Sequence, residues 1–195
     1  MPVIALLAAL TLTQPDLLDR TLALVGGQPI TLSDARAAIA LELIDDPKAP
    51  LPEVTATLVD RELVLREVRR YAPPPPAESV VEARLAEVRQ RYGGSLATIL
   101  AEHGFTETRL HAWIRDDLRT QAYLAQRFAS ASLPSDAEVA AVYTRQRAEF
   151  DAKGLTFDQA APIVRERLIA ERRRELIVDW VADLRRRTDV VILQQ

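Results

Sequence analysis

The sequence predicts a mostly α-helical fold, with several helices and a small β-hairpin near the N-terminus that pairs with a C-terminal strand. Three observations predict this fold. Aromatic residues make up only 5% of the 195 residues and methionine occurs once, so Leu, Val, Ile and Ala must build the core. Long stretches carry apolar residues at the three- and four-residue spacing of one helix face. Two short apolar runs flank Gly26-Gly27, and a third, Val190 to Leu193, lies near the C-terminal end.

The first predicted element is the β-hairpin. Thr21 to Val25 and Pro29 to Leu32 are apolar runs on either side of Gly26-Gly27, and glycine tolerates the positive φ that tight hairpin turns need. A lone two-stranded hairpin is only marginally stable in water, so a third strand or a helix must cover it. Val190 to Leu193 is the remaining strand-like segment, and we predict that it pairs with the hairpin and ties the two ends of the chain together.

Capping residues mark where the predicted helices begin. Ser33 and Ser95 precede strong helix formers, and Thr106 precedes a long apolar stripe, so we expect each of them to be an N-cap. Two further helix starts have the spacing of a capping box: Ser135 with Glu138, and Thr156 with Gln159. The expected helices are Ala35–Ile44, Glu53–Tyr71, Ala77–Tyr92, Ser95–His103, Thr106 to about Ala129, one helix between Leu133 and Gly154, and one from Thr156 to about Arg187.

Prolines interrupt this pattern at two places. Pro73 to Pro76 is a run of four prolines, which cannot continue a helix and should form a stiff, extended spacer. Pro162 falls inside the last predicted helix, where it should kink the helix or delay its regular start.

The N-terminal segment predicts export. Val3 to Leu12 has ten residues and no charge, which is too short for the roughly 20 residues that span a bilayer but fits the apolar region of a signal peptide. We therefore interpret residues 1–13 as a signal peptide cleaved before Gln14, and expect a periplasmic protein without stable membrane insertion. No Lys or Arg precedes the apolar run, so a buried N-terminal helix or strand of a cytoplasmic protein is the alternative.

Composition and motifs argue against several kinds of function. The net charge is −3 and the pI about 5.5, whereas nucleic-acid binders carry a basic excess. The chain has no cysteine, and it contains neither a phosphate-binding glycine loop nor a zinc-binding HExxH motif. His103 and His111 are the only histidines, and neither has carboxylates at a spacing that indicates a metal site. We expect no cofactor, no metal and no catalytic residue.

Three segments resemble the SurA-type periplasmic chaperones and, more loosely, the PrsA-type foldases. The segments are LDRTLALVGGQPITLSD, residues 18–34; YGGSLATILAEHGFTETRLHAWIRDDLRTQAYLAQRF, residues 92–128; and LTFDQAAPIVRERLIAERRRELIVDWVADLRRRTDVVIL, residues 155–193. The resemblance implies a multi-helix chaperone lobe. Residues 14–133 would form its N-terminal helical domain, and residues 134–195 would supply the C-terminal helices and closing strand that complete the same lobe.

The chain departs from the SurA-type pattern in one respect. That family usually carries one or two parvulin isomerase domains between the long helix and the C-terminal helix. Here only Leu133 to Gly154 lies between them, far less than an independent domain needs. The resemblance therefore implies a holdase without isomerase activity, whose clients are unfolded or extended polypeptides, in that family outer-membrane protein precursors.

A holdase needs apolar surface rather than a positioned nucleophile. Long helices joined by loops can form an apolar groove for an extended client, with pairing to a strand edge and motion about Pro73 to Pro76. The candidate peptide-binding residues are aromatic residues near helix ends: Tyr92, Phe105, Trp113 and Tyr123. An aromatic residue on an apolar stripe is also an ordinary core residue, and that alternative stays open for each of them.

Other functions are compatible with the same residues. A helical scaffold or adaptor of the envelope that binds one folded partner would share every feature except promiscuity. An isomerase-related enzyme with an unrecognised active site would show proline isomerisation on a short peptide. A cytosolic chaperone similar to the ribosome-associated trigger factor would keep Met1. The sequence does not decide the clients or the oligomeric state.

Overall fold

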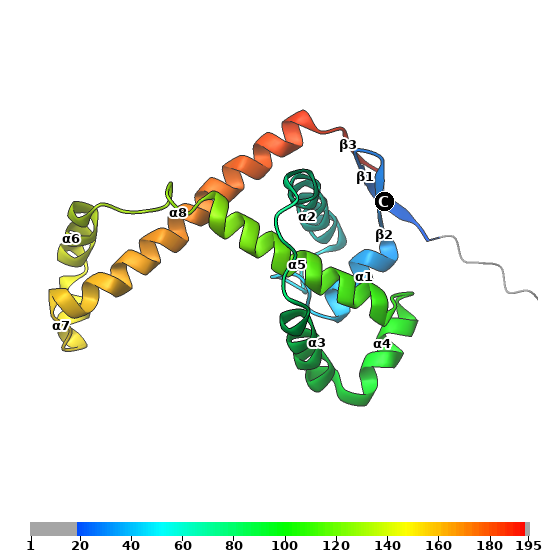
Figure 1. Ribbon diagram of the computed structural model, residues 1–195, viewed down its shortest axis with the longest axis horizontal. Helices are drawn as coiled ribbons and strands as arrows, with labels where there is room; N and C mark the ends of the chain where they lie inside the picture. The colour runs from blue at the N-terminus through cyan, green and yellow to red at the C-terminus, as the bar shows by residue number, and fades with distance from the viewer. Residues whose placement is uncertain (1–18, 194–195) are drawn as a thin grey trace, which may run out of the picture.

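A computed structural model describes residues 19–193, so the predicted signal peptide, residues 1–13, lies outside the described part of the chain. The described chain has eight α-helices, one 3₁₀-helix and a three-stranded sheet, which confirms the predicted mostly helical fold (Figure 1). In order, the elements are β1 (Thr21–Val25), β2 (Gln28–Thr31), α1 (Leu32–Ala40), α2 (Leu51–Tyr71), α3 (Glu78–Tyr92), η1 (Gly93–Ser95), α4 (Leu96–Glu102), α5 (Glu107–Arg127), α6 (Asp136–Arg145), α7 (Arg147–Ala152), α8 (Phe157–Arg187) and β3 (Val190–Ile192).

The sheet joins the two ends of the described chain, as the sequence predicts. Its strand order is β2-β1-β3, and both pairings are antiparallel. Gly26 and Gly27 have φ values of 53° and 84°, a conformation that strains any residue with a Cβ atom, so the Gly-Gly pair makes the hairpin turn possible. The Gly26 amide also donates a 2.7 Å hydrogen bond to the carbonyl oxygen of Asp189, so the same turn anchors the start of β3.

The sheet, α1 to α5 and the C-terminal part of α8 form one body, which we call the lobe (residues 19–128 and 176–193). Its core follows the apolar spacing of the sequence: the buried face of α2 meets β1 and α8 in one cluster, and α3, α4 and the first half of α5 surround a second. Fully buried members of the two clusters include Leu22, Val25, Val59, Leu63, Leu85 and Leu110.

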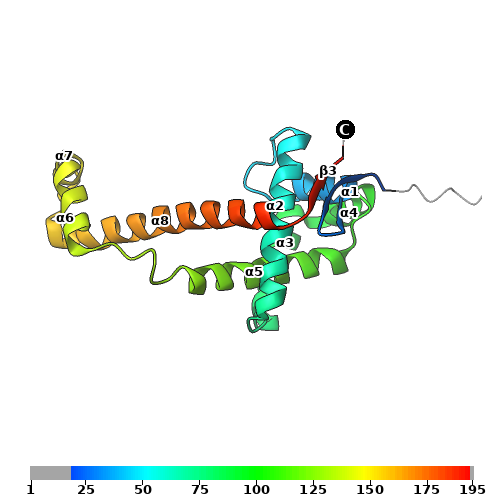
Figure 2. The same cartoon turned by 90° about the horizontal axis from the view of Figure 1, so that it is seen from above.

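α6, α7 and the first part of α8 form a second body, which we call the arm (residues 135–175). Figures 1 and 2 show α8 running out of the lobe as one long helix, with α6 and α7 folded against its far end. The arm has a small core of its own, centred on Val139, Val142, Phe150 and Val164. We expected residues 134–195 to complete a single lobe; only their C-terminal part does so, because the apolar residues of α6 and α7 are covered by the start of α8.

Two predicted helix caps are wrong. Thr31, not Ser33, caps α1: its side chain accepts from the Asp34 amide, and the Asp34 carboxylate accepts from the Thr31 amide in a complete capping box. Ser33 lies within the first turn, where its hydroxyl donates to the carboxylate of Asp19 instead. Ser95 has helical dihedral angles and its hydroxyl donates to the carbonyl oxygen of Tyr92, so it continues a turn rather than capping α4.

The other predicted helix starts are confirmed, with changes inside the helices. The Thr106 cap and the two capping boxes, at Ser135 and Thr156, are all formed. Residues 133–154 hold two short helices rather than one, because the helix breaks at Gln146 between α6 and α7. Pro162 lies within α8 and does not delay its start at Phe157.

Candidate peptide-binding surfaces

One candidate site lies between the β-hairpin, α2 and α5, and we call it the hairpin pocket. It is a cavity of about 300 Å³, at the lower end of the volumes that small ligands occupy in proteins. Its apolar wall comes from β2, α2, α5 and the turn before α5: Pro29, Ile30, Leu58, Leu65, Phe105 and Trp113. Its charged lining is balanced, with three arginines and three carboxylates: Arg61, Arg69, Arg109, Asp34, Glu62 and Asp116.

Arg61 and Trp113 contact each other in the lining of this pocket. The guanidinium carbon of Arg61 lies 3.6 Å from the centroid of the Trp113 ring, a cation–π distance. Its Nη2 atom donates a 3.3 Å hydrogen bond to the Trp113 carbonyl oxygen. Burial lowers the pKa of the Arg61 guanidinium, and the carboxylates of Asp117 and Asp116 act in the opposite direction. The side chain remains a cation, because arginine is not deprotonated in proteins.

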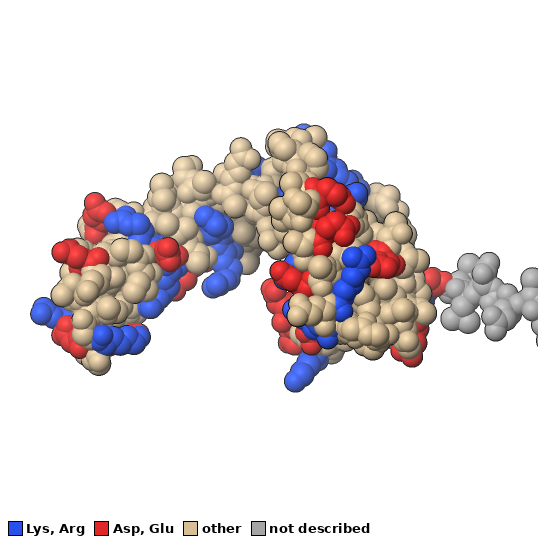
Figure 3. Space-filling model, turned by 60° about the horizontal axis from the view of Figure 1, so that its bottom comes forward, with Lys and Arg blue, Asp and Glu red and all other residues tan. Residues whose placement is uncertain are grey.

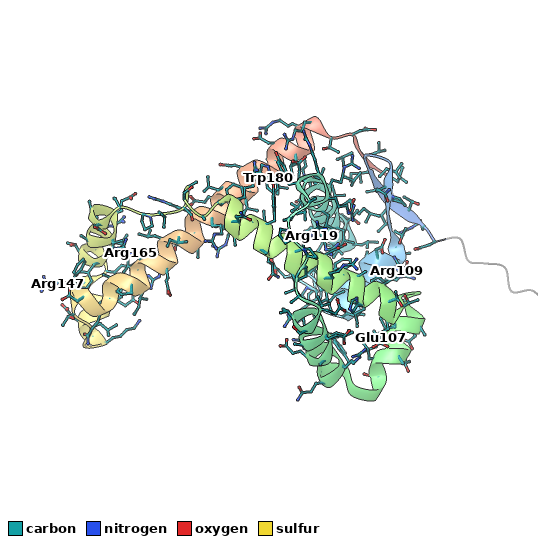
Figure 4. The ribbon with its side chains drawn as sticks, in the orientation of Figure 1. Glu107, Arg109, Arg119, Arg147, Arg165 and Trp180 are labelled. Atoms are coloured by element: carbon teal, nitrogen blue, oxygen red, sulfur yellow. The ribbon has the colours of Figure 1, made fainter. Side chains whose placement is uncertain are left out.

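The two other arginines of the pocket already have carboxylate partners. Arg109, which lies on α5 beside α1 (Figure 4), pairs with Asp34 at 2.6 Å, and Arg69 pairs with Glu62 at 2.8 Å. Within residues 19–193, no carboxylate oxygen lies within 4 Å of the Arg61 guanidinium nitrogens. Within the described pocket lining, Arg61 is therefore the one arginine without a carboxylate partner.

The structure brings two of the four predicted aromatic residues together. Phe105 and Trp113 both line the hairpin pocket, with their ring centroids 6.4 Å apart in an edge-on arrangement. Tyr123 lies elsewhere, buried in an aromatic cluster with Tyr71 and Trp180, and burial raises the pKa of its hydroxyl.

Tyr92 lies at the end of α3, away from the hairpin pocket. Its hydroxyl oxygen is buried and has no hydrogen-bond partner within the described residues, and burial raises the pKa of that hydroxyl. Whether any of the four aromatic residues contacts a client stays a prediction.

A second candidate surface is the free edge of the sheet. β3 lies at one edge, and the Leu193 amide donates a 2.9 Å hydrogen bond to Leu22 across the ladder to β1. In an antiparallel pair, only every second residue directs its backbone N–H and C=O groups toward the partner strand. Val191 does so toward β1, and Val190 and Ile192 direct their N–H and C=O groups away from it. The same segment is apolar and open to solvent: the exposed fractions are 41% for Val191, 54% for Ile192 and 36% for Leu193.

The arm and its connection to the lobe expose further apolar side chains. Figure 3 shows a wide notch between the arm and the lobe, with basic and acidic side chains on both sides. Four large apolar side chains along α8 and in the linker before α6 are exposed: Leu133, Phe157, Ile163 and Val178. Two ion pairs join α6 to α8 within the described residues: Arg165 with Asp136 at 2.8 Å, and Arg172 with Glu138.

Sequence reasoning missed two groups of residues. Arg61 lies three residues after Leu58 and four before Leu65, so helical spacing alone puts it on their face. His111 on α5 meets Glu78 and Glu82 of α3, with Nε2–Oε1 distances of 2.8 Å and 3.4 Å. These three side chains could hold a metal ion, since their ligand atoms all lie within 4.8 Å of one another, and the i, i+4 spacing of the two glutamates was the only signal.

Comparison with known proteins adds no identification. No protein-family model matches the chain, and no curated protein matches it either. Within residues 19–193, no helix combines the length and the apolar character that a membrane crossing requires.

The described lining of the hairpin pocket carries hydrocarbon, aromatic, guanidinium and carboxylate groups, without a hydroxyl, thiol, amine or imidazole. The arrangement can bind a chain through apolar contact, ion pairing and strand pairing.

Proposed function

We propose that this protein is a holdase-type chaperone of the cell envelope, which binds unfolded or extended polypeptides and has no isomerase activity. Outer-membrane protein precursors are the expected clients. The proposal rests on the resemblance of residues 18–34, 92–128 and 155–193 to the SurA-type chaperones and on the surfaces described above.

The observation that carries the proposal is the apolar free edge at β3. An exposed edge strand presents unpaired backbone N–H and C=O groups, which are a template for pairing with another chain. Backbone pairing supplies affinity independently of sequence, and apolar side chains on the edge favour apolar clients. Val190 and Ile192 provide the backbone groups, while Val191, Ile192 and Leu193 provide the exposed apolar surface. This combination suits a protein that must hold many different unfolded chains.

The arm supports the same proposal. Its small core is separate from the cores of the lobe, so the arm presents its surface at a distance from the sheet. Phe157 and Ile163 expose apolar side chains there, and a client that extends from β3 would make further apolar contacts along α8.

Export to the periplasm is part of the proposal, and N-terminal sequencing of the native protein tests it. A sequence that begins at Gln14 would support export, and an intact Met1 would contradict it.

The first test is an aggregation assay. An outer-membrane β-barrel protein unfolded in urea is diluted into buffer, and its light scattering is followed with and without the purified full-length protein. An unrelated soluble client is measured in parallel. We expect near-equimolar protein to suppress the scattering of the barrel protein. If scattering of both clients is unchanged at tenfold molar excess, the holdase proposal is wrong.

A matched pair of variants locates the activity. Ile192→Pro removes an amide that points away from β1, so the ladder within the sheet is kept while the free edge loses a donor. Val80→Ser is the control, because Val80 is an exposed apolar residue of α3 outside the sheet. We expect Ile192→Pro to lose most of the suppression and Val80→Ser to keep it. Equal activity of the two variants would remove β3 from the proposal.

A further inference from the structure

We propose that the hairpin pocket binds the free carboxyl terminus of a client chain that ends in an apolar residue, with Arg61 as the carboxylate-binding residue. This inference rests on the proposed function, because it names the part of a polypeptide client that the pocket takes. Arg61 and Trp113 line the pocket, and Leu58 and Leu65 belong to its apolar wall.

The hydrogen-bonding state of Arg61 calls for an anion. A guanidinium has five N–H donors in a planar fork, and within residues 19–193 Arg61 makes a single hydrogen bond, to the Trp113 carbonyl oxygen. The indole ring covers one face of the guanidinium at 3.6 Å, which leaves the edge of the fork for a ligand. A carboxylate is the planar anion that fits such an edge with two parallel hydrogen bonds.

The apolar wall selects what the carboxylate is attached to. At a chain terminus, the carboxylate and the last side chain share one Cα atom, so a single residue places an anion on Arg61 and an apolar group against Leu58, Leu65 and Ile30. An internal Asp or Glu brings the anion at the tip of its side chain, with polar backbone behind it, and leaves the wall uncovered. A cavity of about 300 Å³ also suits the end of a chain better than a chain that passes through.

The neighbouring charges predict how tightly the pocket binds. Asp34 and Glu62 are held by Arg109 and Arg69. Asp116 has a looser partner, Arg115, at 3.8 Å, and its carboxylate acts on Arg61. An incoming carboxylate would be opposed by Asp116, so removal of that charge should strengthen binding while removal of the Arg61 charge should abolish it.

The test uses two N-terminally labelled hexapeptides that end in Phe, one as the free acid and one as the C-terminal amide, with fluorescence anisotropy on the full-length protein. Because a hydrogen bond to a charged group contributes more than a neutral one, we expect the acid to bind about tenfold more tightly or better. Arg61→Gln should remove this difference and Asp116→Asn should enlarge it. The control Arg84→Gln, on α3 outside the pocket, should leave it unchanged.

The outcomes separate this inference from the proposed function. Equal binding of acid and amide overturns the carboxylate site, even where aggregation of the barrel protein is suppressed. Preference for the acid without any suppression of aggregation overturns the holdase proposal and keeps the site. A misfolded Arg61→Gln protein cannot mimic the expected pattern, because tighter binding by Asp116→Asn needs an intact pocket; unchanged binding by that variant counts against the inference.

Discussion

The guanidinium of Arg119 donates two hydrogen bonds to the carbonyl oxygen of Pro73, from Nε at 3.0 Å and from Nη2 at 2.8 Å. Arg119 lies in the middle of α5 (Figure 4), and Pro73 is the first proline of the spacer that follows α2. The stacking of Tyr71 on Tyr123, 5.8 Å between centroids, lies beside this contact. The start of the spacer is therefore fixed to α5, and any hinge motion must begin after Pro73.

Loss of this contact should destabilise the lobe. In Arg119→Ala, the half-buried Pro73 carbonyl oxygen loses both of its hydrogen-bond donors. Because an unsatisfied group of this kind is destabilising, we expect the free energy of unfolding to fall by about 1–3 kcal/mol. Urea denaturation measures it. Arg115→Ala, on the same helix with an exposed side chain, is the control and should lie within about 0.5 kcal/mol of the unchanged protein. Equal midpoints for the two variants would contradict the anchoring role of Arg119.

Trp180 should be the main residue that fastens α8 to the lobe. Its ring is only 8% exposed and lies between Tyr123 and Phe128, at centroid distances of 6.2 Å and 5.9 Å. We expect Trp180→Ala to lower the free energy of unfolding by about 3–5 kcal/mol, as for other large aromatic residues removed from a core. Val178→Ala is the matched control, since Val178 is on the same helix but 62% exposed. A loss below 1 kcal/mol for Trp180→Ala would show that other contacts hold α8.

The elements that the sequence predicted correctly depend on local chemistry. The hairpin follows from the Gly26-Gly27 turn, and the capping boxes at Ser135 and Thr156 need only residues three positions apart. Pairing of Val190 to Ile192 with β1 was predictable because the described chain offers no other strand to complete the hairpin. The Ser33 cap was mispredicted because Thr31 and Ser33 are both good caps, and the Asp at position 34 completes a box only with Thr31.

Other features depend on contacts that are distant in the sequence. The apolar face of α8 reads as one stripe, yet Val164 joins the arm core and Trp180 the lobe core, and only the placement of α6 decides this division. The hairpin pocket likewise needs α2 and α5 together: Arg61 and Trp113 are 52 residues apart. Aromatic residues near helix ends were a useful guide to Phe105 and Trp113, but burial in an aromatic cluster takes Tyr123 away from the pocket.

The register of β3 leads to a test with two proline variants. Val191 pairs with Leu24 and faces β1, whereas Ile192 directs its amide away from it. Val191→Pro removes a ladder hydrogen bond and should cost at least about 1 kcal/mol of unfolding free energy. Ile192→Pro should cost less, because its amide has no partner in the sheet. Urea denaturation of both variants measures the difference, and a larger loss for Ile192→Pro would show that the register is shifted by one residue.

Acid should weaken the attachment of α6 through Glu138. Hydrogen bonds from the amide and hydroxyl of Ser135, and from Arg172, lower the pKa of Glu138 from its ordinary 4.5 to about 2. The unfolded chain takes up this proton at a higher pH than the folded chain, so the stabilisation is fully present above pH 4.5 and is lost as the pH falls toward 2. The midpoint of urea unfolding should fall between about pH 5 and pH 2.5, and Glu138→Gln should make this fall less steep. Glu166→Gln is the control, because Glu166 is an exposed residue of α8, and it should leave the fall as steep as before. A fall equally steep in Glu138→Gln would assign the acid sensitivity to other carboxylates.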